Sequence, residues 1–179
     1  MQHFALTIIG RDRPGIVSQV TEILFKGGFN IADSSCSILG GQFSMILIIS
    51  NPQISTKEEF SDTFSPLEEH NLSVFIRTLK PGGEIRTELE GELCMISVYG
   101  ADKPGIVYQV ARELGERSIN ITDLNTKLIG DKAKPVYVMM LEAMLPENTE
   151  VEEVETWMRE LKEKLQVDIS VRSLAAMEL

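Results

Sequence analysis

The chain has 179 residues, enough for one large domain or two small ones. Its formal net charge at pH 7 is −10, so the basic face that neutralises phosphates in nucleic-acid-binding proteins is not expected. There is no signal-peptide pattern, no apolar run long enough to span a bilayer and, with two cysteines, no disulfide framework. We therefore expect a cytoplasmic protein that contacts neither nucleic acid nor membrane.

The first predicted elements are a strand and a helix. Apolar and polar side chains alternate over residues 3–9, which is typical of a half-buried strand. After Pro14, apolar residues recur at helical spacing from Ile16 to Leu24. Gly27-Gly28 is expected to end this helix.

Two strands and a broken helix follow. The strands are predicted over residues 31–39 and 42–50, and Gly40-Gly41 between them suits a two-residue hairpin turn with positive φ. Apolar residues from Phe60 to Leu67 predict a second helix, which Pro66 is expected to kink or split. A closing strand is predicted over residues 72–79.

The second half of the chain repeats the first. With an offset of 90 residues, 13 of the 31 positions from Gly10 to Gly40 are identical to those from Gly100 to Gly130. Self-similarity at this level indicates an internal duplication, and two copies indicate two domains. The second copy has a longer hairpin with its tip at residues 131–135, a clear amphipathic helix over 151–165 and a closing strand over 167–174. We expect domains over residues 1–80 and 92–176, with a linker over 81–91.

The fold class follows from the element order. Strand–helix–strand–strand–helix–strand, with right-handed crossovers, gives a four-stranded antiparallel sheet in the order 4-1-3-2 with both helices on one face. The protein is therefore expected to be α+β, with two ferredoxin-like domains. Each small domain leaves a sheet face and an edge strand that need a partner, so a homo-oligomer is expected.

Two motifs carry a resemblance to a known family. Asp12-Arg-Pro-Gly-Ile-Val and Asp102-Lys-Pro-Gly-Ile-Val each follow a first strand, and Asn-Ile opens each second strand. In both features the chain resembles the ACT family of amino-acid-sensing regulatory domains, over both repeats. A protein made of two such domains resembles the glycine cleavage system transcriptional repressor family.

The resemblance implies a ligand and a partner. ACT domains often bind a small amino acid between the first turn of one domain and the second strand of its neighbour. Glycine or serine is then the expected effector, and the partner is a transcriptional activator or an enzyme. In the serine-sensing ACT domain of phosphoglycerate dehydrogenase, the positions that match Gly10, Asp12 and Asn30 contribute to the effector site. This chain differs there, because it has glycine in place of a polar side chain and aspartate in place of an amide.

The residues themselves favour the same site. A helix N-terminus presents unpaired N–H groups that suit a carboxylate, a glycine lets a ligand approach the backbone, and an aspartate suits an ammonium group. An asparagine offers both a donor and an acceptor. The predicted ligand-binding residues are Gly10, Asp12, Pro14, Gly15, Ile16, Asn30 and Ile31, with Gly100, Asp102, Pro104, Gly105, Ile106, Asn120 and Ile121 in the second copy.

Simpler interpretations of these residues stay open. Pro14-Gly15 is also ordinary turn chemistry before a helix, Asp12 also suits a helix N-terminus, and Asn30 also suits a left-handed turn. Both cysteines, Cys36 and Cys94, are expected to pack inertly.

No enzyme motif is recognisable, so no catalytic residue, metal or cofactor is expected. Two rival functions remain: an interaction module without a ligand, and a small enzyme of an unfamiliar type on the same scaffold.

Overall fold

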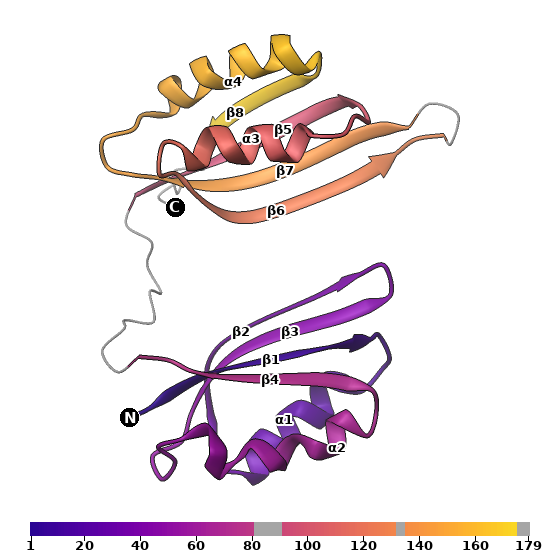
Figure 1. Cartoon of the computed structure of the whole chain (residues 1–179), viewed down its shortest axis with the longest axis vertical. Helices are drawn as coiled ribbons and strands as arrows, with labels where there is room; N and C mark the ends of the chain where they lie inside the picture. Colours follow the sequence, from indigo (N-terminus) through magenta and orange to yellow (C-terminus); the bar gives the residue numbers. More distant parts are fainter. Residues whose placement is uncertain (81–90, 132–134, 175–179) are drawn as a thin grey trace, which may run out of the picture. The chain divides into compact units, whose positions relative to one another are not determined.

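The computed structural model describes residues 1–80, 91–131 and 135–174. The chain divides into two compact units, Met1–Arg86 and Thr87–Leu179, and each unit has its own hydrophobic core. In both units the helices cover one face of a four-stranded sheet (Figure 1). Most of the predicted linker, residues 81–90, lies outside the described residues, as does the predicted end of the second domain at residue 176.

The first unit contains β1 (His3–Arg11), α1 (Ile16–Lys26), β2 (Asn30–Leu39), β3 (Gln42–Ser50), the 3-10 turns η1 (Lys57–Glu59) and η2 (Ser61–Phe64), α2 (Ser65–Glu68) and β4 (Leu72–Thr78). The second unit contains β5 (Glu92–Ala101), α3 (Ile106–Gly115), β6 (Asn120–Ile129), β7 (Val136–Leu145), α4 (Val151–Leu165) and β8 (Asp168–Ser173).

The sheet order confirms the predicted topology. The strands lie in the order β2-β3-β1-β4 in the first unit and β6-β7-β5-β8 in the second, and all neighbours are antiparallel. The first strand of each unit is therefore central, and the second strand lies at an edge. Each edge strand has a matching irregularity, between Ile31 and Asp33 in β2 and between Ile121 and Asp123 in β6. The duplication thus extends to a β-bulge.

The hairpin turn between β2 and β3 is the predicted two-residue turn. Leu39 pairs with Gln42, and the two glycines between them have φ of 58° and 76°. Two consecutive positive φ angles are the signature of the type I′ turn, which glycine accommodates without strain. In the second unit, residues 132–134 of the predicted longer tip lie outside the described residues.

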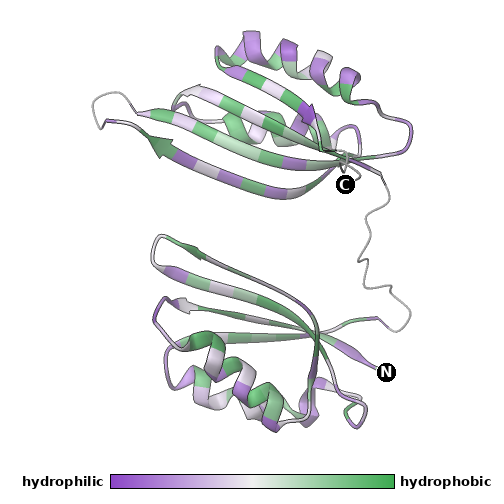
Figure 2. Cartoon of the chain, turned by 180° about the vertical axis from the view of Figure 1, so that it is seen from behind, coloured by the Kyte–Doolittle hydropathy of each residue, from purple (hydrophilic) through white to green (hydrophobic). Residues whose placement is uncertain are grey.

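Each core forms between the helices and the inward side of the sheet. The alternation predicted for the first strand is confirmed, since Phe4, Leu6 and Ile8 are fully buried and Ala5 and Thr7 are not. The same alternation of apolar and polar residues is visible along the strands in Figure 2.

The second helices of the two units differ. In α4, the predicted apolar stripe is buried, and Glu150 and Glu153 form a capping box at the start of the helix. In the first unit the corresponding segment breaks into η1, η2 and the four-residue α2, with Pro66 in the first turn of α2. The break predicted from Pro66 is confirmed, because proline lacks the N–H that would continue a helix across this point. None of the described helices combines the length and the apolar character that a membrane crossing requires.

Candidate ligand-binding site

The Asp-x-Pro-Gly segment forms a tight turn between β1 and α1. Gly15 has φ 92° and ψ −4°, and Pro14 precedes it, as expected for a type II turn with proline and glycine at its centre. Gly105 adopts nearly the same angles, φ 95° and ψ −1°. The helix begins only at Ile16, so Pro14 belongs to the turn and not to the first helical position. The conformation requires glycine, because a side chain at positive φ is strained.

The N-terminus of α1 lacks a side-chain cap. The first helical bond runs from the N–H of Gln19 to the carbonyl oxygen of Gly15, at 3.0 Å, and no described side chain bonds the preceding N–H groups. Asp12 is therefore not an N-cap, although its backbone N–H donates to the carbonyl oxygen of Gly41 at 2.9 Å. The N-terminus of α3 is likewise uncapped, whereas α4 has a capping box. Both Asp-x-Pro-Gly turns thus leave helix N–H groups available to an anion.

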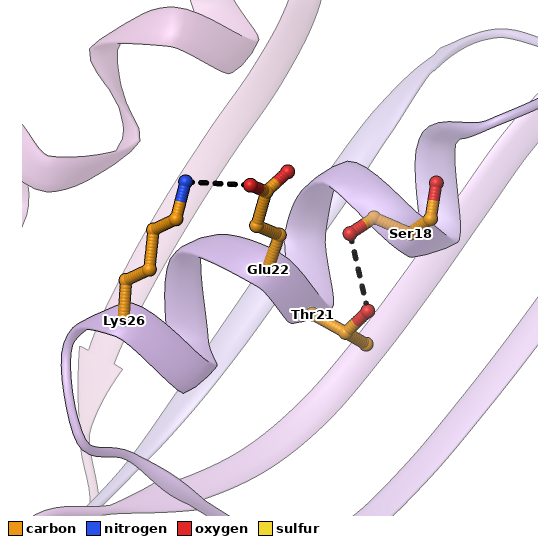
Figure 3. A network of polar contacts seen from close by, with 4 residues as sticks. All are labelled: Ser18, Thr21, Glu22 and Lys26. Carbon is orange, nitrogen blue, oxygen red and sulfur yellow. Dashed lines mark hydrogen bonds and ion pairs between the residues drawn. The ribbon is translucent and has the colours of Figure 1, made fainter.

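The exposed side of α1 is occupied by local contacts. The Ser18 hydroxyl donates to the Gly15 carbonyl oxygen at 2.9 Å, and the Thr21 hydroxyl donates to the Ser18 carbonyl oxygen at 3.2 Å. Further along, Lys26 pairs with Glu22 (Figure 3). This pair is exposed and one helical turn apart, so it supports the helix and not the turn.

An open hollow of about 530 Å³ lies beside the first turn. The structure brings three predicted site residues to it, Asp12, Gly15 and Ile16. It also brings residues that the sequence did not suggest, namely Arg13, Val17, Ser18, Cys36, Ser37, Ile38 and Phe43. The signal that locates Ile38 and Phe43 is the hairpin register, because Phe43 pairs with both Ile38 and Gly10.

Asn30 does not lie beside the turn of its own unit. It pairs with Ser50, which pairs with His3 at the start of β1, whereas the turn follows the end of β1. Eight residue steps along β1, from His3 to Arg11, separate the two ends, or roughly 26 Å at the rise of a strand. Ile31 lies at the same distant end. Asn120 and Ile121 occupy the same positions in β6, opposite Met144 and Ala143.

The left-handed interpretation of Asn30 is wrong. Asn30 begins β2, and the positive φ angles occur two residues earlier, at Gly28 (70°) and at its counterpart Ser118 (59°). Asn30 and Asn120 are both exposed strand residues. Their side chains are therefore available to a neighbouring domain.

Gly10 and Gly100 are packing residues. A Cβ atom at Gly10 would lie 2.6 Å from Leu72 Cδ2 and 2.9 Å from the carbonyl oxygen of Asn71. A Cβ atom at Gly100 would lie 2.7 Å from Val167 Cγ1. These distances explain why the chain has glycine where the serine-sensing domain has a polar side chain. In each unit, the chain at the start of the last strand approaches the first strand so closely that no side chain fits at this position.

The turn of the second unit is held by different contacts. Lys103 donates to the carbonyl oxygen of Leu165 at 3.1 Å, whereas its counterpart Arg13 donates to Gln19 Oε1 at 2.7 Å. The carbonyl oxygen of the Gln109 side chain, which corresponds to Gln19, is buried without a described partner. The repeat therefore preserves the backbone of the turn but not its side-chain contacts.

The two cysteines lie in opposite surroundings. Cys94 is fully buried in the second core, as predicted, whereas the expectation of inert packing for Cys36 is wrong, because Cys36 is exposed and lines the hollow. Burial raises the pKa of the Cys94 thiol to about 11, and the Glu92 carboxylate adds to the shift. Among the described residues, no three histidine, cysteine or acidic side chains gather closely enough to hold a metal ion.

This difference predicts one reactive thiol in the native protein. At pH 8, iodoacetamide should modify Cys36 and leave Cys94 unmodified, because the thiolate is the nucleophile and Cys94 is both buried and protonated. Mass spectrometry of the intact protein and of its peptides measures both sites. Cys36→Ser is the control and should abolish native-state labelling. Equal labelling of both cysteines before unfolding would contradict the buried position of Cys94.

Comparisons with known proteins give a consistent result. The sequence profile of the ACT domain matches residues 2–73 and 92–172. A UPF0237 protein of Methanococcus maripaludis is 35% identical over 69 residues, which are 38% of this chain and 74% of that protein. The glycine cleavage system transcriptional repressor of Escherichia coli is 27% identical over 124 residues, which are 69% of this chain but only 64% of the repressor.

Solved structures agree on the architecture. An unknown protein from Galdieria sulphuraria superposes with a TM-score of 0.80 and 25% identity, over 97% of this chain and 99% of its own. A candidate glycine cleavage system transcriptional repressor superposes with a TM-score of 0.71 over 97% of both chains, at 22% identity. The second likeness establishes the fold alone. Both cover the two repeats.

Proposed function

This chain belongs to the ACT domain family, and we propose that it is a regulatory protein that binds a free amino acid and acts by protein–protein contact. The main support for this proposal is the N-terminus of α1, which has no side-chain cap and lies, together with Asp12, beside the hollow. The helix N–H groups suit the carboxylate of an amino acid, and the Asp12 carboxylate suits its ammonium group. One turn therefore offers binding partners for both the carboxylate and the ammonium group of a free amino acid.

The proposed site is completed by a second copy of the chain. β2 is an edge strand that is exposed along all ten residues, so its outer backbone groups are available for pairing. Antiparallel pairing of two full β2 strands sets residue 30 of one chain opposite residue 39 of the other, because the strand covers residues 30–39. This arrangement brings Asn30 of one copy to the turn of the other. It also explains why the two motifs lie at opposite ends of one sheet.

The mode of action follows from that geometry. An amino acid held between two copies stabilises the paired arrangement by its differential affinity for it, and a partner protein responds to the arrangement. The relationship to the glycine cleavage system transcriptional repressor supports a role in transcriptional regulation. The partner expected from the family resemblance is a transcriptional activator, with an enzyme as the alternative. With a net charge of −10, the protein is not expected to bind duplex DNA itself.

Isothermal titration calorimetry with the common free amino acids tests the proposal. Glycine and serine head the panel, because the family resemblance suggests them. Saturable binding of at least one amino acid supports a sensor. If none binds at millimolar concentration while the exposed β2 edge still captures a second copy, the chain is an interaction module without a ligand.

A charge placed on β2 is expected to separate the copies. Ser35 lies at the centre of β2, so Ser35→Lys would place two lysines near the two-fold axis, and like charges across strands are destabilising. We expect a monomer by sedimentation velocity and weaker amino-acid binding. Ser73→Lys on β4, the other edge strand, is the matched control and should change neither. Oligomers of equal size for both variants would remove β2 from the interface.

A further inference from the structure

The two turns have different side chains at two matching positions. Phe43 pairs with Gly10 in the first unit, and Tyr137 pairs with Gly100 in the second. Cys36 lies opposite Met45, and Thr126 lies opposite Met139 at the corresponding place. The first repeat therefore has a phenyl ring and a thiol where the second has two hydroxyl groups.

In the second unit these hydroxyl groups engage each other. Tyr137 is two residues before Met139 on β7, so it is a diagonal neighbour of Thr126 on the same face of the sheet. Burial raises the pKa of Tyr137, the nearby Asp102 carboxylate raises it further, and a hydrogen bond with Thr126 lowers it. The Tyr137 hydroxyl group thus lies close enough to the Asp102 carboxylate for this charge to raise its pKa. In the second unit, a hydroxyl group that already bonds Thr126 therefore lies near the carboxylate that would receive an ammonium group.

In the first unit the matching wall is apolar. Phe43 has no hydroxyl group, and it lines the hollow together with Ile16, Val17, Cys36 and Ile38. The charged side chains of the lining, Asp12 and Arg13, both come from the turn. The lining therefore combines charged groups from the turn with apolar side chains from α1 and the β2–β3 hairpin, together with Ser18 and Ser37. This combination suits an amino acid with an apolar side chain.

We propose that the first repeat alone holds the effector, and that the effector has an apolar side chain seated against Ile38 and Phe43. This inference rests on the proposed function and specifies its site and ligand class. Each methylene group buried against such a wall contributes about 0.8 kcal/mol, or roughly fourfold in affinity. Glycine and serine have no apolar side chain to bury against Ile38 and Phe43, so they lack this contribution to affinity.

An exchange of residues between the repeats tests the inference. The double variant C36T/F43Y brings the pair of the second repeat into the first, at positions that have the same strand pairing in both sheets. The reciprocal variant T126C/Y137F is the matched control. Isothermal titration calorimetry with leucine, isoleucine and methionine, compared with glycine and serine, measures affinity and stoichiometry. Circular dichroism verifies that both variants are folded.

We expect one apolar amino acid per wild-type chain, bound at least tenfold more tightly than glycine. C36T/F43Y should weaken it at least tenfold, and T126C/Y137F should leave its affinity unchanged. If C36T/F43Y fails to fold, Ile38→Ser serves instead, because Ile38 is exposed and its loss should weaken only apolar ligands. Two ligands per chain, tighter binding of glycine or serine, or equal effects of both exchanges would overturn the inference and leave the proposed function intact. Wild-type protein that binds no amino acid would overturn both.

Discussion

Gly10→Ala is expected to lower the free energy of unfolding of the first repeat by about 1–3 kcal/mol, the usual cost of inserting an atom into a packed site. The new Cβ would meet the backbone carbonyl oxygen of Asn71 at 2.9 Å and the Leu72 side chain at 2.6 Å. Leu72 could rotate, but the Asn71 carbonyl oxygen belongs to the backbone of the turn directly before β4. For a domain of this size, each 1 kcal/mol corresponds to roughly 4–8 °C in Tm. Differential scanning calorimetry of the intact chain measures the shift.

Gly115→Ala is the matched control for this substitution. Gly115 is the last residue of α3, and a Cβ there would meet nothing within 4 Å, so alanine should be neutral or slightly stabilising. If Gly10→Ala left Tm unchanged and weakened amino-acid binding, Gly10 would be a ligand contact after all. The packing account of this position would then be wrong.

Asp12→Ala is expected to weaken amino-acid binding by roughly 1.5–3 kcal/mol, the range for a hydrogen bond to a charged group. Because the Asp12 side chain does not cap α1, its loss should leave Tm nearly unchanged. The backbone bond from Asp12 to Gly41 survives the substitution. Calorimetric titration and thermal unfolding of the same preparation measure both quantities.

Glu58→Ala is the control for the change in charge. Glu58 is an exposed acid in η1, and it lies neither on β2 nor in the lining of the hollow. It should leave affinity within about twofold of wild type, since surface substitutions away from a site are usually worth less than ~0.5 kcal/mol. Equal losses for the two variants would indicate a general charge effect and remove Asp12 from the site.

The fold could be predicted from the sequence because its signals are local. Alternation in β1, helical spacing after Pro14 and the paired glycines at 40 and 41 each specify one element, and the 90-residue offset supplies each signal twice. The exact form of the segment around Pro66 was not predictable. Proline indicates a break, but whether the pieces become 3-10 turns or helix depends on their packing.

The site could be predicted only in part. The turn itself is specified by Pro14 and Gly15, and the structure confirms its conformation. The separation of Asn30 from the turn of its own unit was not predictable from the motif, because it depends on where α1 returns the chain along the sheet. The packing role of Gly10 depends on contact with Leu72, which is distant in sequence. Exposure of Cys36 depends on the helices leaving the edge strand uncovered.

The most direct test of amino-acid binding at the first turn is the rate at which iodoacetamide modifies Cys36. This small reagent enters the hollow that Cys36 lines, so a ligand seated there must obstruct it. We predict that a saturating amino acid slows the reaction at least tenfold, with a midpoint equal to its Kd. Asp12→Ala should lose the protection at the same concentration. An amino acid that binds by calorimetry but leaves the rate at Cys36 unchanged would place the effector elsewhere and contradict the account.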